Sequence, residues 1–464
     1  MKLSLIGGGG VRSPLFASTA LRWQARTGLT ELCLFDIDAR KLALFGALCR
    51  EIVHRGGDPF IVTTTTDAQE ALSGAAHVVT TIRAGFEQGR ALDERIALRH
   101  GVLGQETTGP GGFAMALRSI PAILDYARIL QQLSPGAWMY NFTNPAGLVT
   151  QALRDAGFER TIGICDGANA GQLSIAHWAG VAESHIRAEV FGLNHLSWCR
   201  AARLDGEDLL PRALADDGYL RQAQGLFEPA LVRMIGMHLN EYLYYHYYAE
   251  QALAAIKIEG MTRGEEIVEL NTRLIEQLEE IGVERDPERA LRAFFGYEKR
   301  RSATYMHYAY GGMSIEAVNR QQMFDADIPA SAGEGYAGVA LALIEALETG
   351  KPLFTALNVP NTGAIQGMRA EDVVEVSCRV DGNGAHPLPT GEVPAPQLGL
   401  MQAIKLYERL TVQAIREHSR TLAIEALMAH PLVLSYSRAR PLVDEYLSVH
   451  KAYVDYERWN VATF

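Results

Sequence analysis

Four consecutive glycines stand directly after a short apolar run at the start of the chain, which begins MKLSLIGGGGVRSPLF. The run at residues 2–6 is typical of a buried strand, and residues 13–28 are typical of a helix with Ser13 as N-cap and Pro14 as first helical residue. Glycine accepts positive φ angles and lets backbone N–H groups approach a phosphate at a helix N-terminus. A simple turn is the alternative. Between a strand and a helix, the glycines predict a loop that cradles a dinucleotide: Gly7, Gly8, Gly9 and Gly10.

Short apolar runs alternate with helical stretches through the first 165 residues. After the first strand, further strands are expected at 32–38, 60–66, 77–82, 137–142 and 161–165. Strands separated by helices form a parallel sheet. Asp36 closes the second strand, where a carboxylate binds the ribose 2′-hydroxyl of NAD and disfavours NADP. We therefore expect an α/β protein in which residues 1–166 form a Rossmann-type, doubly wound parallel sheet that binds NAD.

The length and charge of the chain narrow its class. A chain of 464 residues predicts two domains, the second over residues 167–464. A net charge of −11 without a basic stripe argues against a nucleic-acid partner, and no apolar run is long enough to span a membrane. The N-terminal apolar run is too short for a signal peptide, and five scattered cysteines do not form a disulfide framework. Together, these features favour a protein that is located in the cytoplasm.

Two side chains suit a divalent metal. Cys165 ends the predicted strand at 161–165, and therefore lies at the carboxyl edge of the sheet, where ligands bind in such folds. His195 follows within GLNHLSW at 192–198. A thiolate and an imidazole suit a borderline-soft divalent metal, although two unrelated core residues are the alternative. The pair is a candidate metal site.

Several longer motifs follow one another in a fixed order along the chain. They are GGGGVRSP (7–14), GRALDERIALRHGVLGQETTGPGGFAMALRSIP (89–121), YNFTNPAG (140–147), GICDG (163–167), GLNHLSW (192–198), NVPNTGAI (358–365), KLYERLTVQAI (405–415) and ALMAHPLV (426–433). With these motifs, nearly the whole chain resembles glycoside hydrolase family 4, the NAD- and divalent-metal-dependent glycosidases. The resemblance implies a C-terminal α+β domain of the lactate/malate dehydrogenase type that carries substrate, metal and subunit contacts, and a homodimer or homotetramer.

The resemblance implies hydrolysis by oxidation and elimination, and members of this kind are exceptions to the two-carboxylate mechanism. Tightly held NAD⁺ takes a hydride from C3 of the sugar, a base removes the C2 proton, and the aglycone leaves C1. Water then adds and the steps reverse, so that no cofactor is consumed. The metal, usually Mn²⁺ in the family, would be held by Cys165 and His195. The chemical softness of a thiolate and an imidazole by itself favours zinc as much as manganese.

The base in the family is a tyrosine. An ungapped match of the segment before NVPNTGAI places it at Tyr336 and not at Tyr305, Tyr308 or Tyr310. The alternative for Tyr336 is a ring packed at a domain seam. A phenol is a weak base at its ordinary pKa near 10, so a nearby metal would have to lower that pKa.

Further residues match family positions around the ligands. Ser13 matches a position near the cofactor. Two of the positions that match the substrate site also allow a structural role. Asn144 would then be a turn residue, and Glu106 would cap a helix. The positions that the resemblance assigns to the substrate are Arg83, Arg90, Glu106, Asn144 and Asn194.

Asp166 bears on the substrate class. In the family, Asp after the metal-binding cysteine is typical of 6-phospho-α-glucosidases, Asn of 6-phospho-β-glucosidases and His of enzymes for non-phosphorylated α-glycosides. The blocks GQETTGPGGF and YERLT nevertheless resemble the β-specific group, and Gly167 departs from the usual proline. The carboxyl group of Asp166 is a candidate general acid for an α-linked leaving group. We nevertheless expect a 6-phospho-β-glucosidase, with a phosphate bound by Arg90 with Arg12 or Arg83. The alternatives are the two α-specific classes, an NAD-dependent 2-hydroxy-acid dehydrogenase and a silent NAD sensor.

Two segments of the second half carry structural expectations. MHLNEYLYYHYYAEQAL at 237–253 is predicted as an aromatic helix of the core or of a subunit interface. The segment 284–333 is longer than the corresponding segment of the family. We expect it to be an insertion that shapes the aglycone pocket or a subunit contact.

Overall fold

The computed structural model describes residues 1–309, 323–329 and 334–459 of the chain. Within them, one sheet has the strand order β13-β12-β11-β6-β5-β4-β1-β2-β3. The order 3-2-1-4-5-6 of its parallel part is that of doubly wound dinucleotide-binding sheets, which confirms the predicted fold class. The parallel strands are β1 (Lys2–Ile6), β2 (Glu31–Phe35), β3 (Ile61–Thr65), β4 (His77–Thr80), β5 (Trp138–Asn141) and β6 (Thr161–Gly163).

Helices connect these strands and cover the sheet. The central strands β1 and β4 are almost entirely buried, whereas the edge strand β3 is rich in threonine and partly exposed. The Asp38 carboxylate caps α2 by accepting a hydrogen bond of 3.1 Å from the Lys41 N–H. The helices are α1 (Ser13–Thr27), α2 (Ala39–Arg55), α3 (Ala68–Leu72), α4 (Phe86–Arg99), α5 (Pro110–Leu133) and α6 (Ala146–Asp155).

Helix α1 begins one residue earlier than predicted. Arg12 is its N-cap and Ser13 its first helical residue, because the Phe16 N–H donates to the Arg12 carbonyl oxygen at 3.1 Å. The Ser13 N–H in turn donates to the Gly10 carbonyl oxygen at 3.1 Å, so the chain already turns within the glycine loop.

Three antiparallel strands of the second half extend the same sheet. Residue 358 of β11 pairs with residue 163 of β6, so the sheet continues past the predicted boundary at residue 166, and that boundary stays a prediction. A second, smaller sheet has the order β10-β8-β7, with β9 beside β8. The strands are β7 (Arg187–Leu193), β8 (Leu196–Leu204), β9 (Glu207–Asp208), β10 (His238–Leu239), β11 (Leu353–Pro360), β12 (Val373–Asp381) and β13 (Gly384–Pro387).

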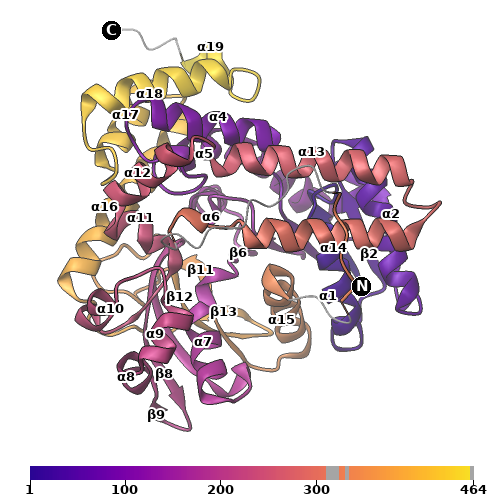
Figure 1. The fold of residues 1–464 in the computed structure, drawn as a ribbon, viewed down its shortest axis with the longest axis horizontal. Helices are drawn as coiled ribbons and strands as arrows, with labels where there is room; N and C mark the ends of the chain where they lie inside the picture. Colours follow the sequence, from indigo (N-terminus) through magenta and orange to yellow (C-terminus); the bar gives the residue numbers. More distant parts are fainter. Residues whose placement is uncertain (310–322, 330–333, 460–464) are drawn as a thin grey trace.

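The remaining helices surround the two sheets (Figure 1). Helices α13 and α14 lie side by side and pack on α2 around a second apolar core that includes Phe45, Leu274 and Phe294. Among the described helices, none combines the length and apolar character that crossing a bilayer requires. They are η1 (Gly167–Asn169), α7 (Ala170–Ala179), η2 (Glu183–His185), α8 (Leu210–Ala215), α9 (Asp217–Ala223), α10 (Pro229–Ile235), η3 (Glu241–Leu243), α11 (Tyr244–Tyr247), α12 (Ala249–Glu259), α13 (Arg263–Ile281), α14 (Pro287–Ala303), η4 (His307–Ala309), α15 (Gly335–Thr349), α16 (Ala395–Glu417), α17 (Arg420–Ala429), α18 (Tyr436–Val449) and α19 (Tyr456–Trp459).

The segment 237–253 is not the single aromatic helix that the sequence predicts. His238 and Leu239 pair with β8 as strand β10, and the Asn240 side chain then accepts a hydrogen bond of 3.0 Å from the Tyr242 N–H. The chain continues as η3, α11 and the start of α12. The predicted helix is therefore broken by a strand pairing with residues about 40 positions earlier. The proposed insertion at 284–333 begins with α14 and lies partly outside the described residues.

A buried ionic cluster joins the N-terminal helices to the end of the chain. Both guanidinium nitrogens of Arg118 on α5 bond the Asp93 carboxylate on α4, at 2.9 and 2.6 Å. The His450 Nε2 after α18 lies 2.5 Å from the same carboxylate, and the Tyr446 hydroxyl donates to the Asp93 carbonyl oxygen. The side chains of Arg118 and Asp93 are fully buried. Loss of one partner leaves an uncompensated charge in the core.

We expect Arg118→Ala to lower the free energy of unfolding by about 3–5 kcal/mol, because it leaves the Asp93 charge buried without its main partner. The matched control is Arg128→Ala, which removes an ion pair with Asp125 whose side chains are 59% and 70% exposed, and should change stability little. Urea unfolding of both variants followed by circular dichroism measures the difference. Equal stabilities would contradict a structural role for the cluster.

Candidate active site

A cavity of about 1970 Å³ opens at the carboxyl ends of the parallel strands. Sites for drug-sized ligands measure roughly 300–1000 Å³, so this cavity has room for a dinucleotide beside a second molecule. Its position is the one where doubly wound sheets bind ligands. The predicted site residues that line it are Gly7, Gly9, Gly10, Ser13, Asp36, Arg83, Arg90, Glu106, Asn144, Cys165, Asp166 and His195.

The glycine loop forms one end of the cavity and leaves no space for side chains. Gly7 has φ +100°, and a Cβ there would lie 2.8 Å from the Thr81 hydroxyl oxygen. A Cβ on Gly9 would lie 2.9 Å from the Asp36 carboxylate, which accepts a 3.0 Å hydrogen bond from the Gly9 N–H. Gly8 packs on Leu34 beneath the loop, outside the cavity lining. The loop with its acidic neighbour fits a dinucleotide with a free ribose 2′-hydroxyl.

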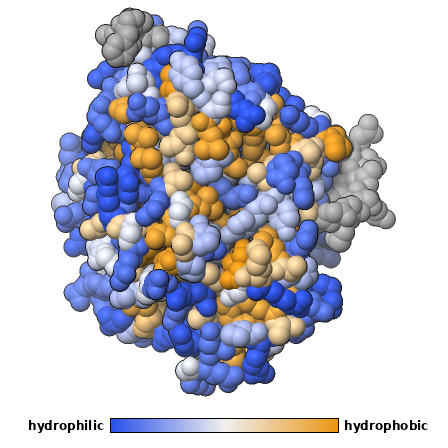
Figure 2. All heavy atoms as spheres, turned by 90° about the vertical axis from the view of Figure 1, so that its left-hand side faces the viewer, coloured by the Kyte–Doolittle hydropathy of each residue, from blue (hydrophilic) through white to orange (hydrophobic). Residues whose placement is uncertain are grey.

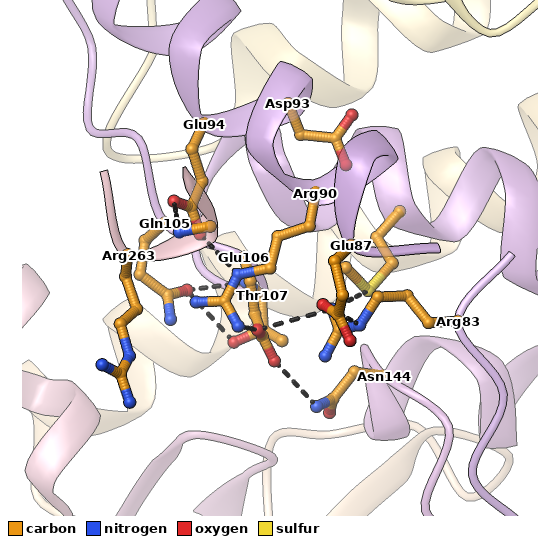
Figure 3. Close-up of polar contacts among 12 residues, drawn as sticks. Arg83, Glu87, Arg90, Asp93, Glu94, Gln105, Glu106, Thr107, Asn144 and Arg263 are labelled. Carbon is orange, nitrogen blue, oxygen red and sulfur yellow. Dashed lines mark hydrogen bonds and ion pairs between the residues drawn. The ribbon is translucent and has the colours of Figure 1, made fainter. Parts of the chain in front are cut away.

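A cluster of polar and charged side chains lines the middle of the cavity (Figure 3). They come from α4, from the loops before and after it, and from the segment after β5. Arg90 forms ion pairs with Glu94, at 2.8 Å, and with Glu106. Arg83 lies 3.5 Å from Glu106, and the Asn144 amide donates to Glu106 at 3.2 Å. The Glu106 carboxylate is therefore the centre of this cluster and its side chain is nearly buried.

Cations decide the protonation state of Glu106. Burial alone would raise its pKa, but the charges of Arg83 and Arg90, the largest of the opposing causes, outweigh burial and hold the pKa at about 2. Glu106 is therefore an anion at neutral pH, and it accepts hydrogen bonds instead of donating a proton.

Cys165 and His195 enter the cavity from different sheets. Cys165 follows β6, and His195 belongs to the two-residue turn between β7 and β8. His195 has φ +62°, a conformation that side chains other than glycine rarely adopt. Its Nδ1 shares a 2.9 Å hydrogen bond with the Thr107 hydroxyl, which fixes the ring and leaves Nε2 for a ligand.

Burial favours the uncharged form of both candidate ligands, which suits the imidazole for metal binding, whereas a metal would have to displace the proton of the thiol. Burial lowers the pKa of His195 to about 4, although Glu106 and Asp166 oppose the shift, so the imidazole is neutral at pH 7. Burial, with the charges of Glu375 and Asp166, raises the pKa of the Cys165 thiol well above its ordinary value. Among the described residues no group of three or more Cys, His, Asp or Glu side chains is placed to hold a metal ion. A cation here would therefore take two ligands from the protein and the others from water or substrate.

Asp166 lies beside Cys165 with an exposed carboxylate. Its oxygen is 3.7 Å from the Arg12 guanidinium, which extends from the glycine loop. Both side chains line the cavity, so Asp166 stands between the candidate metal ligands and the candidate dinucleotide loop.

Besides Gly8, two predicted residues do not line the cavity. Tyr336 stacks on Phe142, with ring centroids 4.2 Å apart and an interplanar angle of 12°, and is 3% exposed. Its hydroxyl is buried without a hydrogen-bond partner among the described residues. Asn194 directs its amide away from the cavity, to Glu375 at 3.3 Å, and accepts from the Gly147 N–H at 3.4 Å. Tyr310, another tyrosine considered above, lies outside the described residues.

The structure instead brings a different tyrosine to the metal candidates. The Tyr242 ring stacks on the His195 ring, with centroids 3.8 Å apart and an interplanar angle of 4°. Burial raises the pKa of Tyr242 well above its ordinary value. Sequence reasoning missed this residue because its neighbours are aromatic and were interpreted as core. The polar pair Asn240 and Glu241 inside the aromatic run was the available signal.

Arginines of the C-terminal half also line the cavity, among them Arg263 and Arg301. Arg263 lies at the start of α13 (Figure 3). It donates to Glu266 at 2.7 Å and to the Arg301 carbonyl oxygen at 2.8 Å. Arg301 pairs with Glu298 at 3.8 Å, and its buried Nε has no hydrogen-bond partner among the described residues. Both side chains add positive charge opposite the cluster around Glu106.

Comparison with known proteins identifies relatives over nearly the whole length of the chain. The profile of the Family 4 glycosyl hydrolases matches residues 2–180, and that of the Family 4 glycosyl hydrolase C-terminal domain matches residues 190–433. The chain is 30% identical to the probable 6-phospho-beta-glucosidase of Bacillus subtilis (strain 168), over 98% of this chain and 97% of that protein.

Solved structures extend the match to three dimensions. The 6-phospho-beta glucosidase from Thermotoga maritima, solved with manganese, NAD+ and glucose-6-phosphate, is 27% identical with a TM-score of 0.81, covering 98% of this chain and 99% of that one. A 6-phospho-alpha-glucosidase from gut microorganisms, solved with NAD and Mn2+, is 26% identical with a TM-score of 0.78 over 98% of both chains.

A more distant likeness concerns the fold alone. Malate dehydrogenase from Salinibacter ruber, 12% identical, superposes with a TM-score of 0.51 over 90% of this chain.

The resemblance found in the sequence motifs is confirmed. The chain belongs to family 4 of the glycosyl hydrolases and is a glycosidase.

Proposed function

We propose that the protein is a 6-phospho-β-glucosidase that uses NAD and Mn²⁺ and cleaves the glycosidic bond by oxidation at C3 and elimination. One observation carries the proposal: the glycine loop with Asp36 opens into the same cavity as the Cys165 and His195 pair. NAD supplies a hydride acceptor there, and Mn²⁺ a Lewis acid. The similarity to the 6-phospho-beta-glucosidases of Bacillus subtilis and Thermotoga maritima supports the β-linked, phosphorylated class.

The protein's own residues bind and orient the ligands. Backbone N–H groups of the glycine loop face the dinucleotide phosphates, and the Asp36 carboxylate accepts from the ribose. Cys165 and the free Nε2 of His195 would hold the metal. Glu106 and Asn144 bind sugar hydroxyls, because an anionic acceptor and an amide donor stand side by side in the cavity. Asp166, exposed beside the metal candidates, is the group placed to protonate the leaving oxygen.

We place the base that removes the C2 proton at Tyr242 and not at Tyr336. The Tyr242 ring lies against His195 in the cavity, whereas the Tyr336 ring is packed behind Phe142. A cation held by Cys165 and His195 would lower the raised pKa of the Tyr242 phenol and so make the phenolate accessible. Geometry thus favours the tyrosine that contacts the metal-ligating ring.

Binding of the 6-phosphate requires cations. Arg83 and Arg90 already face Glu106, Glu87 and Glu94, which compensate much of their charge. Arg301 offers a buried Nε without a partner among the described residues, and we add it to Arg83 and Arg90 as a phosphate ligand.

The surface and the cysteines support the remaining proposals, a homo-oligomer in the cytoplasm. All five cysteines are free and buried. Helices α16 to α18 and the loop between them expose large apolar side chains, and Figure 2 shows apolar patches among hydrophilic residues on the side of the molecule where α16 and α17 lie. These side chains are Leu406, Met428, Leu434 and Tyr436. Exposed apolar patches of this kind mark subunit contacts.

We expect Tyr242→Phe to lower kcat by about 10²–10⁴-fold, the usual contribution of a general base. The matched control is Tyr336→Phe, which removes a hydroxyl of the same chemistry outside the cavity and should leave kcat nearly unchanged. Steady-state release of nitrophenol from a nitrophenyl β-glucoside 6-phosphate measures both. The opposite ranking would place the base at Tyr336.

Glu106→Gln tests the anionic state of that carboxyl. The pKa of Glu106 is about 2 in the folded protein and 4.5 in the unfolded chain, so its ionisation stabilises the fold by about 3 kcal/mol at pH 7. Because a depressed pKa stabilises only above the unfolded value, the contribution is lost as pH falls from about 5 toward 2. We expect the stability difference between parent and variant, measured by urea unfolding, to shrink over that range. A difference that does not change with pH would contradict the assignment.

The reaction route is tested with NAD⁺, Mn²⁺ and a thiol reductant present. Hydrolysis in D₂O should place deuterium at C2 of the released sugar phosphate, without net NADH. Accumulating NADH would instead indicate a dehydrogenase, and hydrolysis by enzyme stripped of nucleotide would refute the oxidation step.

Omission of the 6-phosphate from the substrate should lower kcat/KM by about 10⁴-fold, because buried cations would lose their partner.

A further inference from the structure

A carboxylate with no assigned role lies directly behind the metal candidates. Glu375 is the third residue of β12 and is 0% exposed. An ionised carboxylate in a protein core is costly unless hydrogen bonds satisfy it. The groups that satisfy Glu375 therefore indicate what holds it there.

Three side chains from three different segments donate to this carboxylate. The Ser197 hydroxyl on β8 donates at 2.7 Å, the Asn358 amide on β11 at 3.0 Å, and the Asn194 amide in the turn before β8 at 3.3 Å. Burial raises the pKa of Glu375, and these three hydrogen bonds oppose the shift.

Each donor lies next to a residue of the active site. Asn194 directly precedes His195 in the strained turn. Asn358 pairs with Gly163 of β6, two residues before Cys165. Glu375 thus bonds the turn that carries His195 directly through Asn194, and it reaches the strand before Cys165 indirectly, through Asn358 on the neighbouring strand β11.

The hydrogen bonds continue to the base and to the segment after Cys165. The Asn240 amide donates to the Ser197 hydroxyl at 3.3 Å and lies 3.5 Å from the Gly167 carbonyl oxygen. The Asn240 carbonyl oxygen accepts from the Tyr242 N–H at 3.0 Å. One connected network therefore spans the segments of Cys165, His195 and Tyr242.

We propose that Glu375 is the positioning residue of the metal site, which holds the Cys165 strand end and the His195 turn in one geometry and whose negative charge favours a divalent cation between them. The inference rests on the proposed function, since it assumes that these two residues bind the metal. Buried groups of this kind, which orient metal ligands without touching the metal, typically change metal affinity about 10–100-fold when removed.

The test compares Glu375→Gln with the parent enzyme. The variant keeps the size of the side chain and removes the charge. We expect its Kd for Mn²⁺, measured by electron paramagnetic resonance titration, to rise about 10–100-fold. The Kd for NAD⁺, measured by quenching of protein fluorescence, should stay unchanged because the glycine loop lies outside the network.

The matched control is Asp372→Asn, three residues earlier in the chain. Asp372 is equally buried, but it pairs with Arg409 and has no contact with the metal candidates. It should lower the melting temperature without weakening Mn²⁺ binding. If Glu375→Gln fails to fold, Ser197→Ala, which keeps the charge and removes one donor, should still weaken Mn²⁺ binding with NAD⁺ binding intact.

Each outcome decides the inference. Folded Glu375→Gln with the parent's Mn²⁺ affinity overturns the role of Glu375 and leaves the proposed function standing, as does unchanged affinity in Ser197→Ala when the first variant does not fold. An equal loss of NAD⁺ and Mn²⁺ binding shows a merely structural role and also overturns it. A parent enzyme that binds no Mn²⁺ overturns both the inference and the metal-dependent function.

Discussion

The active site depends on the convergence of parallel strand ends at one edge of the sheet. Because β1, β4, β5 and β6 run in the same direction, the segments that follow them lie together. These segments carry the glycine loop, Arg83, Asn144 and Cys165. A change in the direction of any one strand would place its segment at the opposite edge, so the topology is a precondition of the chemistry.

The second half of the chain completes what the parallel sheet begins. Antiparallel β11 and β12 extend the sheet beyond β6 and bring Glu375 behind Cys165, while the turn between β7 and β8 delivers His195. Opposed charges and burial then determine protonation states before any ligand binds: Glu106 is an anion and the His195 imidazole is neutral. Groups held in their working state in this way need little reorganisation during reaction.

Local patterns account for the parts of the structure that were predicted well. The glycine loop, Asp36 and Cys165 lie at strand ends, and strand ends can be recognised from short apolar runs. Long-range pairing accounts for the parts that were not. The segment around Tyr242 was expected to be helical, but residues 238 and 239 pair with β8 and break the helix. Asn194 was expected at the substrate, yet the turn directs its amide to a carboxylate 181 residues later in the chain.

The sequence alone determined the family, the doubly wound sheet and the identity of the residues at its carboxyl edge, because each of these follows from the order of motifs along the chain. The tertiary structure decided which tyrosine lies against the metal candidates, which predicted residues line the cavity, and that one buried carboxylate links the segments that carry them. The reason is physical. Side-chain direction and burial depend on which distant strands pair, and a hydrogen bond between residues 197 and 375 leaves no periodic signal in either segment.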